Sequence, residues 1–247
     1  MIETARLRIL ALTNLFPSPW DPRRAAFNRQ QFERLGRVHD VSVRVAVNFL
    51  DRLRGRRGDP GTRIAADCFT FVYPPGFARP LHAAFWYASL MLQGGWRIRR
   101  GEYDCLLASW ASPDAVAVSW LARRLRVPYV VKVHGSDLNT QAEQPLRRRQ
   151  IARALQEAHG VIAVSRALAE KAVELGADPA RVHTIYNGVD ADRFSPGSRE
   201  EARRRLKLDA GGPIVLYVGN LKLSKGCRDL LDAFPAVLGR HADARLF

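Results

Sequence analysis

Short apolar runs recur along the chain, and longer segments with a helical spacing of apolar residues lie between them. Apolar runs without a polar face are typical of strands buried on both sides, and their alternation with helices predicts a parallel sheet with helices on both faces. The fold class is therefore α/β. The predicted strands are Leu7–Leu15, Val41–Val47, Cys105–Ala108, Tyr129–Val133, Val161–Val164, His183–Tyr186 and Ile214–Val218.

Helices are predicted where apolar residues return every three or four positions. One of them stops at Gly176, a residue that suits the left-handed backbone found just past a helix end. In a parallel sheet the binding loops lie at the carboxyl ends of the strands. The predicted helices are Arg24–Gly36, Pro113–Leu125, Pro145–Ala158, Arg166–Leu175, Arg199–Lys207 and Arg228–Leu238.

The pattern breaks at Asp190–Gly197, a stretch that contains proline, glycine and serine. A charged helix and a fresh strand follow it, so we place a domain boundary there. Residues 1–198 are expected to form a first domain with its linker, and residues 199–247 the beginning of a second α/β domain. This second part holds one strand, one helix and the start of another strand at residues 244–247.

The composition is that of a globular protein, because 47% of the residues are apolar and 9% are aromatic. The 247 residues include 39 lysines and arginines against 24 aspartates and glutamates, which gives a net charge of +15. The basic excess is spread along the chain. It favours an acidic partner but does not form a basic tail of the kind that binds nucleic acid.

Cys68, Cys105 and Cys227 are odd in number and far apart, so they predict neither a disulfide framework nor a metal or redox pair. The N-terminal segment has a short apolar run and no small-residue cleavage site, which argues against a secretory signal. The longest apolar stretch, Leu81–Trp96, is too short and too interrupted to span a bilayer. We therefore expect a reducing, cytoplasmic location.

The aromatic segment from Phe77 to Trp96 runs into Arg97, Arg99 and Arg100. Such a helix suits a membrane surface, and it equally suits a protein core, so its composition does not decide between the two. Together with the basic run at residues 147–149, it makes an anionic membrane surface an expected partner.

The loop Gly219–Gly226 follows a predicted strand and opens a helix. Free N–H groups and the helix dipole attract anions there, and Lys225 adds a positive charge. The order of residues matches neither the Walker A motif nor GxGxxG. A phosphate site and an ordinary strand-to-helix turn therefore remain alternative interpretations of this loop.

Three further polar segments are candidates for function. The loop Phe16–Phe27 is long, proline-rich and basic, and HGSD at residues 134–137 places an imidazole at a strand end. Asp190 and Asp192 follow an Asn-Gly pair, which favours a turn over a cation site. The motifs HExxH and GxSxG are absent from the sequence, so zinc hydrolase and esterase activities have no residues to support them.

Four of these segments occur in a fixed order: HGSD at 134–137, Ser165 within VIAVS, YNGVD at 186–190 with Phe194, and VGNLKLSKG at 218–226. In this order they resemble glycosyltransferase family 4. The resemblance implies a retaining, metal-independent enzyme of GT-B fold that uses a nucleotide sugar, with two Rossmann-like domains facing a cleft. Residues 1–198 would be the acceptor-side domain, and 199–247 a donor domain within which the chain is truncated.

The resemblance also implies roles for single residues. Lys225 is expected to neutralise the leaving diphosphate and His134 to contact the transferred sugar, so both are expected to be catalytic. Arg24, Asn28 and Asp137 are expected at the acceptor. The residues expected to bind the donor are Asn187, Gly219, Asn220, Lys225 and Gly226. No metal and no other cofactor is expected, because the donor phosphate and Lys225 supply the charges that the reaction needs.

The expected activity is transfer of a hexose from a nucleotide sugar to a glycan or lipid-linked acceptor with retention, on the inner face of the membrane. Residues 1–247 alone are expected to be inactive. Asn220 and the pair Ala25-Ala26 stand where the family commonly has an arginine and a glycine. The alternative is a non-catalytic relative that binds a glycan, a lipid head group or nucleic acid through its basic surface. If the protein is the transferase, no specific nucleic acid is expected as a partner.

Overall fold

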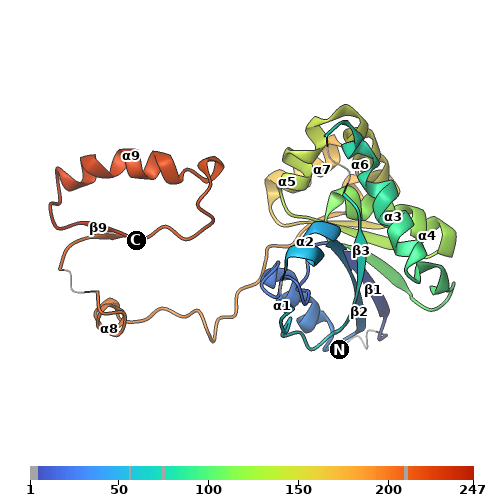
Figure 1. Cartoon of the computed structure of the whole chain (residues 1–247), viewed down its shortest axis with the longest axis horizontal. Helices are drawn as coiled ribbons and strands as arrows, with labels where there is room; N and C mark the ends of the chain where they lie inside the picture. Colours follow the sequence, from blue (N-terminus) through green and yellow to red (C-terminus); the bar gives the residue numbers. More distant parts are fainter. Residues whose placement is uncertain (1–4, 56, 74–75, 209–210) are drawn as a thin grey trace. The chain divides into compact units, whose positions relative to one another are not determined.

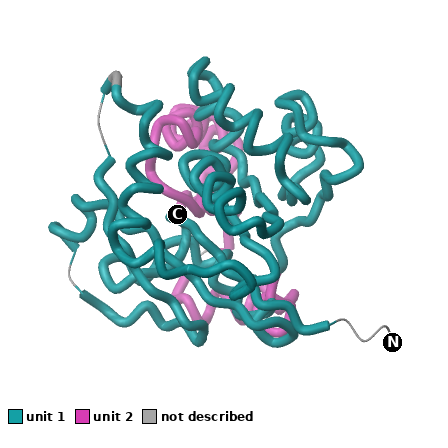
Figure 2. Tube along the Cα trace, turned by 90° about the vertical axis from the view of Figure 1, so that its right-hand side faces the viewer, with its two compact units in different colours: residues 1–188 teal, residues 189–247 magenta. Residues whose placement is uncertain are grey.

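A computed structural model describes residues 5–55, 57–73, 76–208 and 211–247 (Figure 1). The first four residues of the N-terminal segment discussed above lie outside the described residues. The chain divides into two compact units, residues 1–188 and 189–247, which Figure 2 shows in different colours. The boundary expected at residue 198 falls within the second unit, just before its first helix.

Unit 1 is built on a seven-stranded sheet with the order β3-β2-β1-β4-β5-β6-β7. All neighbouring strands run parallel, which confirms the predicted fold class. The strands are β1 (Arg8–Thr13), β2 (Asp40–Asn48), β3 (Ala65–Phe71), β4 (Cys105–Ala108), β5 (Tyr129–Val133), β6 (Gly160–Ala163) and β7 (Val182–Thr184).

Strands β1 and β4 lie side by side in this sheet, with Ile9 paired to Cys105 and Leu12 to Ala108. From this pair the strand order proceeds outward in both directions. Loops that leave the carboxyl ends of two such strands diverge, and the crevice between them is where open α/β sheets bind ligands. The loops after β1 and β4 are therefore placed to form a site.

Helices cover the two faces of the sheet (Figure 1). Helix α1 (Ala26–Leu35) packs on one face, and α2 (Phe49–Arg54) continues directly from β2. The other face is covered by α3 (His82–Leu92), α4 (Val116–Leu125), α6 (Pro145–Gln156) and α7 (Arg166–Glu174). Short helical turns complete the unit: η1 (Gly76–Leu81), η2 (Gly95–Arg97), η3 (Ala111–Ala115), α5 (Ser136–Asn139), η4 (Gln141–Glu143) and η5 (Pro179–Arg181).

Two hydrophobic cores follow from the alternation of side chains along β1. Leu10 and Leu12 belong to the large core beneath α3, α4, α6 and α7. Ile9 and Ala11 belong to the smaller core, which contains Phe32 of α1. Burying one aliphatic side chain contributes about 1.5–3 kcal/mol. A shift of β1 by one residue would exchange the two sets, so burial fixes its register.

The aromatic segment, whose environment the sequence left undecided, forms a core helix. Trp86 and Leu90 of α3 are fully buried, and the Trp86 ring meets Phe69 edge-on at 4.8 Å between centroids. The outer side of α3 is also apolar, with Phe85 and Leu92 exposed to solvent. Because both sides of the helix are apolar, its composition carried no periodic signal that could separate core from surface.

The structure differs from the predicted elements in several places: α2 was not predicted, and the strand expected at Ile214–Val218 is confined to Ile214–Val215. Strand β3 was also missed, because it is an edge strand in which only Phe69 and Phe71 are buried, so it forms no continuous apolar run. The helix expected from Pro113 begins at Val116. It is preceded by η3, in which Ser112 has a non-helical backbone.

Unit 2 contains α8 (Arg199–Arg205), η6 (Leu223–Lys225), α9 (Cys227–Leu238) and a pair of parallel strands, β8 (Ile214–Val215) and β9 (Arg245–Leu246). The structure describes all residues of α9, and each of them is exposed or half-buried. Leu216, Val218 and Leu221 are also largely exposed. Unit 2 thus has little core of its own. Among all described residues, none of the helices has the length and apolar character needed to cross a membrane.

Candidate active site

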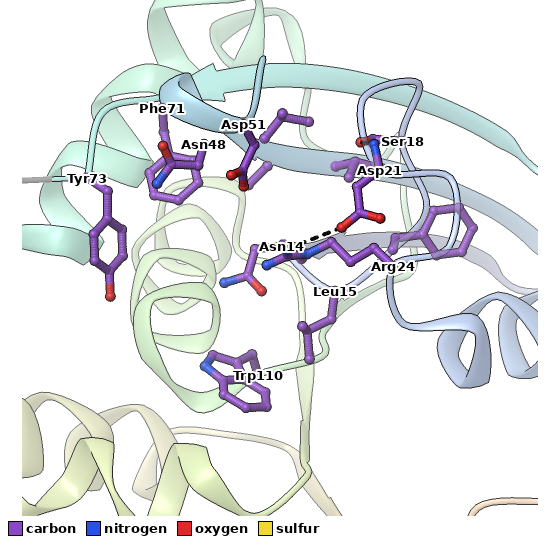
Figure 3. Close-up of a pocket in the computed structure, with 14 residues that line it drawn as sticks. Asn14, Leu15, Ser18, Asp21, Arg24, Asn48, Asp51, Phe71, Tyr73 and Trp110 are labelled. Carbon is purple, nitrogen blue, oxygen red and sulfur yellow. Dashed lines mark hydrogen bonds and ion pairs between the residues drawn. The ribbon is translucent and has the colours of Figure 1, made fainter. Parts of the chain in front are cut away.

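A cavity of about 280 Å³ lies at the carboxyl ends of β1 to β4 (Figure 3). Ligand pockets usually measure about 300–1,000 Å³, so this one suits a small ligand or one ring of a larger ligand. Its lining comes from the loop between β1 and α1, from the ends of β2 and β3 with the residues that follow them, and from the segment after β4. The polar and aromatic lining residues are Asn14, Phe16, Ser18, Asp21, Arg24, Asn48, Asp51, Phe71, Tyr73 and Trp110.

The proline-rich loop between β1 and α1 forms an ordered wall of the cavity. Ser18 and Asp21 exchange two backbone hydrogen bonds of 3.1 Å, which close a tight turn. Between them, the Trp20 ring lies 4.7 Å from the guanidinium of Arg52 and 5.5 Å from that of Arg57. Such cation–π contacts hold the loop against the segment that carries α2.

Arg24, which was expected at the acceptor, lies at the edge of this cavity. Its Nε donates a hydrogen bond of 2.6 Å to the backbone oxygen of Asn14. Its Nη1 lies 3.7 Å from Oδ2 of Asp21, an ion pair drawn in Figure 3. The positive charge of Arg24 is thus largely balanced by Asp21, and one of its donors is already occupied.

Asp51 and Trp110 lie on opposite sides of Asn14 in the cavity (Figure 3). Asn48 begins α2 by accepting a hydrogen bond of 2.8 Å from the backbone N–H of Leu50. Within the described residues, the carboxylate of Asp51 makes neither a hydrogen bond nor an ion pair. Asp51 is therefore available to a ligand, whereas the amide oxygen of Asn48 serves the helix.

His134 follows β5, next to the residues that end β4. Its Nε2 lies 3.0 Å from the hydroxyl oxygen of Ser109, and its ring contacts those of Phe27 and Trp110 at 5.0 and 6.0 Å between centroids. Burial, and to a smaller extent the positive charge of Lys132, lowers the pKa of His134 to about 3. The imidazole is therefore neutral at physiological pH and offers one donor and one acceptor.

Asp137, also expected at the acceptor, is buried and does not line the cavity. Its carboxylate accepts hydrogen bonds from the backbone N–H groups of His134, Gly135 and Ala111, at 2.7 to 3.2 Å. Burial raises the pKa of Asp137, against the opposing effect of these donors. Asp137 thus connects the loops after β4 and β5, and it positions His134 through the backbone of that residue.

Asn28, the third residue expected at the acceptor, is buried beneath the first loop. Its Nδ2 donates to the backbone oxygen of Leu15 at 2.8 Å, which ties α1 to the end of β1. Asp114 supports the same loop, because its Oδ2 accepts from the N–H of Asn14 at 2.8 Å. Burial raises the pKa of Asp114 to about 7, although the hydrogen bond from Asn14 acts in the other direction.

Helix α1 starts from a left-handed residue, Ala25, with φ of 46° and ψ of 51°. Residues with a side chain rarely adopt this conformation, whereas glycine adopts it freely. The backbone oxygen of Ala25 still accepts a hydrogen bond of 2.9 Å from the N–H of Asn28. Ala25, one of the two alanines where the family resemblance implies a glycine, therefore adopts a backbone conformation that favours glycine.

Asn187, expected at the donor, takes part in a cluster away from the cavity lining. Its Oδ1 accepts hydrogen bonds from Gln31 Nε2 at 2.8 Å and from Lys132 Nζ at 3.2 Å, and Lys132 also donates to Gln31 Oε1. Burial lowers the pKa of Lys132 to about 8. Asn187 thus ties the end of unit 1 to α1 and β5.

The loop Gly219–Gly226, with the other residues expected at the donor, belongs to unit 2. Its backbone folds on itself, since the N–H of Lys222 donates to the oxygen of Asn220 and the N–H of Lys225 to that of Lys222. Gly226 has a φ of 73° and begins α9. The exposed Lys225 side chain and the first N–H groups of α9 are consistent with an anion site.

The cavity residues that no candidate segment of the sequence included are, among others, Asn14, Asn48, Asp51, Tyr73 and Trp110. Asn14 was placed inside a predicted strand, and Tyr73 follows β3, the strand that was not predicted. Asn14, Tyr73 and Trp110 lie within two residues of the carboxyl ends of β1, β3 and β4, the edge at which parallel sheets bind ligands. Trp110 could have been found in this way, because it follows the predicted strand Cys105–Ala108, whereas Asn14 lay inside a predicted strand.

Solved structures define the class of protein. The chain is similar to HepE of Anabaena, crystallised with UDP and glucose, with a TM-score of 0.66, 18% identity, and coverage of 98% of this chain and 60% of that one. Sucrose-phosphate synthase from Thermosynechococcus elongatus gives a TM-score of 0.66 at 18% identity, with 97% and 61% covered. The fold is that of the GT-B glycosyltransferases.

Sequence similarity gives the family. Glycosyltransferase Family 4 matches residues 30–193, and the chain belongs to this family. A D-inositol 3-phosphate glycosyltransferase of Catenulispora acidiphila is 34% identical over 59% of this chain and 36% of its own length. TuaC of Bacillus subtilis, named as a teichuronic acid biosynthesis glycosyltransferase, is 26% identical over 94% and 63%. The chain thus spans less than two thirds of the length of either relative.

Proposed function

We propose that the protein transfers a hexose from a nucleotide sugar to a glycan or lipid-linked acceptor, with retention of configuration. The observation that carries this proposal is the cavity of unit 1, where unpaired polar groups meet at the carboxyl edge of a family 4 sheet, beside the neutral His134. The relatives are named as glycosyltransferases, and HepE was crystallised with UDP and glucose. Both facts support a nucleotide-sugar donor.

The acceptor enters the cavity of unit 1 in this proposal. Arg24 lines that cavity, whereas Asn28 and Asp137 act as positioning residues, because both are buried and bonded to the backbone of neighbouring loops. His134 contacts the transferred sugar through a neutral imidazole that Ser109 and Asp137 hold in place. Residues 1–198 form the acceptor-side domain and its linker.

The donor diphosphate binds the loop Gly219–Gly226, within a donor domain that begins at residue 199. Lys225 opposes the negative charge of the leaving diphosphate, and the first N–H groups of α9 add to it. Asn220 and Asn187 contact the donor, and Lys222 supplies a second cation close to the position of Asn220. No metal or other cofactor takes part, because these groups supply the positive charge.

In the transfer step the acceptor oxygen forms a bond to the anomeric carbon, and the bond from that carbon to the phosphate oxygen breaks. The acceptor proton passes to the leaving phosphate oxygen on the same face of the sugar, which gives retention. The protein supplies positioning and electrostatic stabilisation. Residues 1–247 by themselves lack this activity in the proposal, since the described residues of unit 2 contribute one strand pair, two helices and the Lys225 loop.

We place the protein at the inner face of the cytoplasmic membrane, where its exposed basic residues meet anionic lipids. Trp96, Arg97, Arg99 and Arg100 are all exposed, and Arg97 stacks on the Trp96 ring at 5.2 Å. Arg147 is a correction to the expected surface, because it is buried. Sedimentation with anionic and neutral vesicles at low and high salt tests this placement.

A donor screen on the complete protein tests the proposed activity. Each nucleotide sugar is offered with a glycan or lipid-linked acceptor, with and without a chelator, and the anomeric configuration of the product is determined by NMR. Transfer with retention that survives the chelator supports the proposal. Glycan or lipid binding without turnover of any donor would favour the non-catalytic alternative, and a requirement for manganese would contradict metal-independent transfer.

A further inference from the structure

We propose that the cavity of unit 1 selects an acceptor ring that carries free hydroxyl groups and no phosphate, and that Asp51 is the residue that sets this preference. The inference rests on the proposed function, because it names the chemical class of the acceptor. It depends on which groups in the cavity are already bonded to protein and which remain available to a ligand.

The charges in the cavity leave one negative group uncompensated. Arg24 is paired with Asp21 at 3.7 Å and donates to the backbone of Asn14 at 2.6 Å. Within the described residues, Asp51 has no such partner. The opposite charges of Asp21 and Arg24 offset each other. A ligand beside α2 therefore meets the negative electrostatic field of the Asp51 carboxylate.

The remaining polar groups suit hydroxyl groups. In the described part of the chain, the amide of Asn14, the hydroxyl of Tyr73 and the indole N–H of Trp110 make no side-chain hydrogen bond within the protein. Together with Asp51 they offer both donors and acceptors, and a hydroxyl group can pair with either kind. The rings of Tyr73 and Trp110 also supply apolar faces for the C–H groups of a sugar or cyclitol ring.

A phosphate on the bound ring would meet the wrong charge. It carries a charge of about −1.5 to −2 near neutral pH and needs strong donors or cations. Asp51 repels it, and Arg24 is paired with Asp21 at 3.7 Å, while its Nε already donates to the backbone of Asn14. Repulsion between like charges in a partly enclosed site disfavours binding of a phosphorylated ring. The preference for a neutral ring therefore arises from this repulsion as well as from hydrogen bonds to its hydroxyl groups.

Binding to the 247-residue chain tests the inference with matched pairs of probes. The pairs are myo-inositol with D-inositol 3-phosphate, glucose with glucose 6-phosphate, and N-acetylglucosamine with its 6-phosphate, each titrated by saturation-transfer NMR. We expect at least one neutral member to bind, with its phosphorylated partner at least tenfold weaker. High salt should reduce this ratio, because ions screen the repulsion.

Three variants locate the effect. Trp110→Ala should abolish binding of the neutral probe if the ring lies in this cavity. Asp51→Asn keeps the shape of the side chain and should reduce the preference ratio at least threefold. Asp67→Asn removes the same charge from an exposed position on β3 and should leave the ratio unchanged. Thermal unfolding of each variant confirms that the fold is intact.

Several results would overturn the inference. They are equal or tighter binding of the phosphorylated members, an unchanged ratio in Asp51→Asn, and no binding of any neutral probe at millimolar concentration. The proposed transferase activity is tested separately by the donor screen. Turnover of a phosphorylated acceptor would preserve the proposed function and refute this inference. Binding with the expected ratio but no turnover of any donor would support this inference and contradict the proposed function.

Discussion

The hydroxyl oxygen of Ser109 and Nε2 of His134 lie 3.0 Å apart, at the carboxyl ends of the neighbouring strands β4 and β5. Asp137 accepts hydrogen bonds from the backbone N–H groups of the same histidine and of Ala111. The imidazole is thus fixed through its side chain and its main chain. Its burial keeps it neutral, which has a measurable consequence for stability.

His134→Gln should weaken the dependence of stability on pH. In the unfolded chain a histidine takes up a proton as the pH falls below about 6.5, whereas folded His134 does so only near pH 3. Its contribution to stability is therefore complete above pH 6.5 and is lost at up to about 1.4 kcal/mol per pH unit as the pH falls toward 3. Urea unfolding at pH 7, 6 and 5 should show a steeper loss in the wild type.

The matched control for this prediction is His183→Gln, since His183 is exposed on β7. It should leave the pH dependence of the wild type unchanged. Equal slopes for His134→Gln and the wild type would show that His134 takes up its proton at a similar pH in both states.

Ala25→Gly should raise the free energy of unfolding by about 0.5–1 kcal/mol. The left-handed backbone at φ of 46° costs alanine about 1–2 kcal/mol, and the greater freedom of glycine in the unfolded chain offsets part of the gain. Ala26→Gly, at the first residue of α1, should not raise stability. Thermal and urea unfolding measure both variants, and a loss in Ala25→Gly would show that the alanine methyl group makes stabilising contacts.

The parallel sheet could be predicted because its central strands are buried on both faces. Leu10 and Leu12 face one core and Ile9 and Ala11 the other, so the whole of β1 is apolar. Strand β3 lies at the edge of the sheet, where Asp67 is exposed, and this strand gave no such run. The signal was therefore strongest where the sheet is covered on both faces.

The site was less predictable than the sheet, because a polar residue's role depends on whether the fold buries it. Asp137 and Asn28 belong to recognisable segments, yet both are buried supports of the neighbouring loops. Arg24 in contrast lines the cavity. Asp51 lies outside every motif, and only the pairing of β2 with β1 brings it next to Asn14.

Arg147→Ala should lower the free energy of unfolding by about 2–4 kcal/mol, because it leaves buried acceptors without their donor. The guanidinium donates to Nδ1 of His82 at 2.6 Å, to the backbone oxygen of Arg79 at 3.1 Å, and to the side chain of Gln141. Arg148→Ala, at the exposed next residue, should change stability by no more than about 0.5 kcal/mol. Urea unfolding compares the two, and equal small effects would contradict a structural role for Arg147.

Lys225→Ala in the complete protein should lower turnover by more than tenfold. A cation on the leaving diphosphate is expected to contribute at least about 1.4 kcal/mol to lowering the barrier. Lys171→Ala is a suitable control, because it removes a lysine whose ion pair with Glu174 lies on the surface of α7. Initial rates at saturating donor measure the effect, and wild-type turnover would remove the loop from the mechanism.

Limited proteolysis should separate the two units. The segment after Gly188 is exposed, with Val189 and Phe194 both more than 60% exposed, and its hydrogen bonds are those of a local turn at Asp190. Local opening of such a segment costs little, because few buried contacts are lost. Unit 1 in contrast is held by two cores across seven strands. Cleavage should therefore begin between residues 189 and 205.

Trypsin offers the sharpest form of this experiment, because Arg193 and Arg199 lie in the exposed segment and unit 1 carries many arginines of its own. Brief digestion followed by mass spectrometry should give a resistant fragment that ends at Arg193 or Arg199, while unit 2 is degraded further. Addition of a ligand for the cavity should protect unit 1 without slowing the first cut. First cleavage inside unit 1 would contradict the prediction, and uniform resistance through residue 247 would show that unit 2 is stabilised by contacts beyond its own strands and helices.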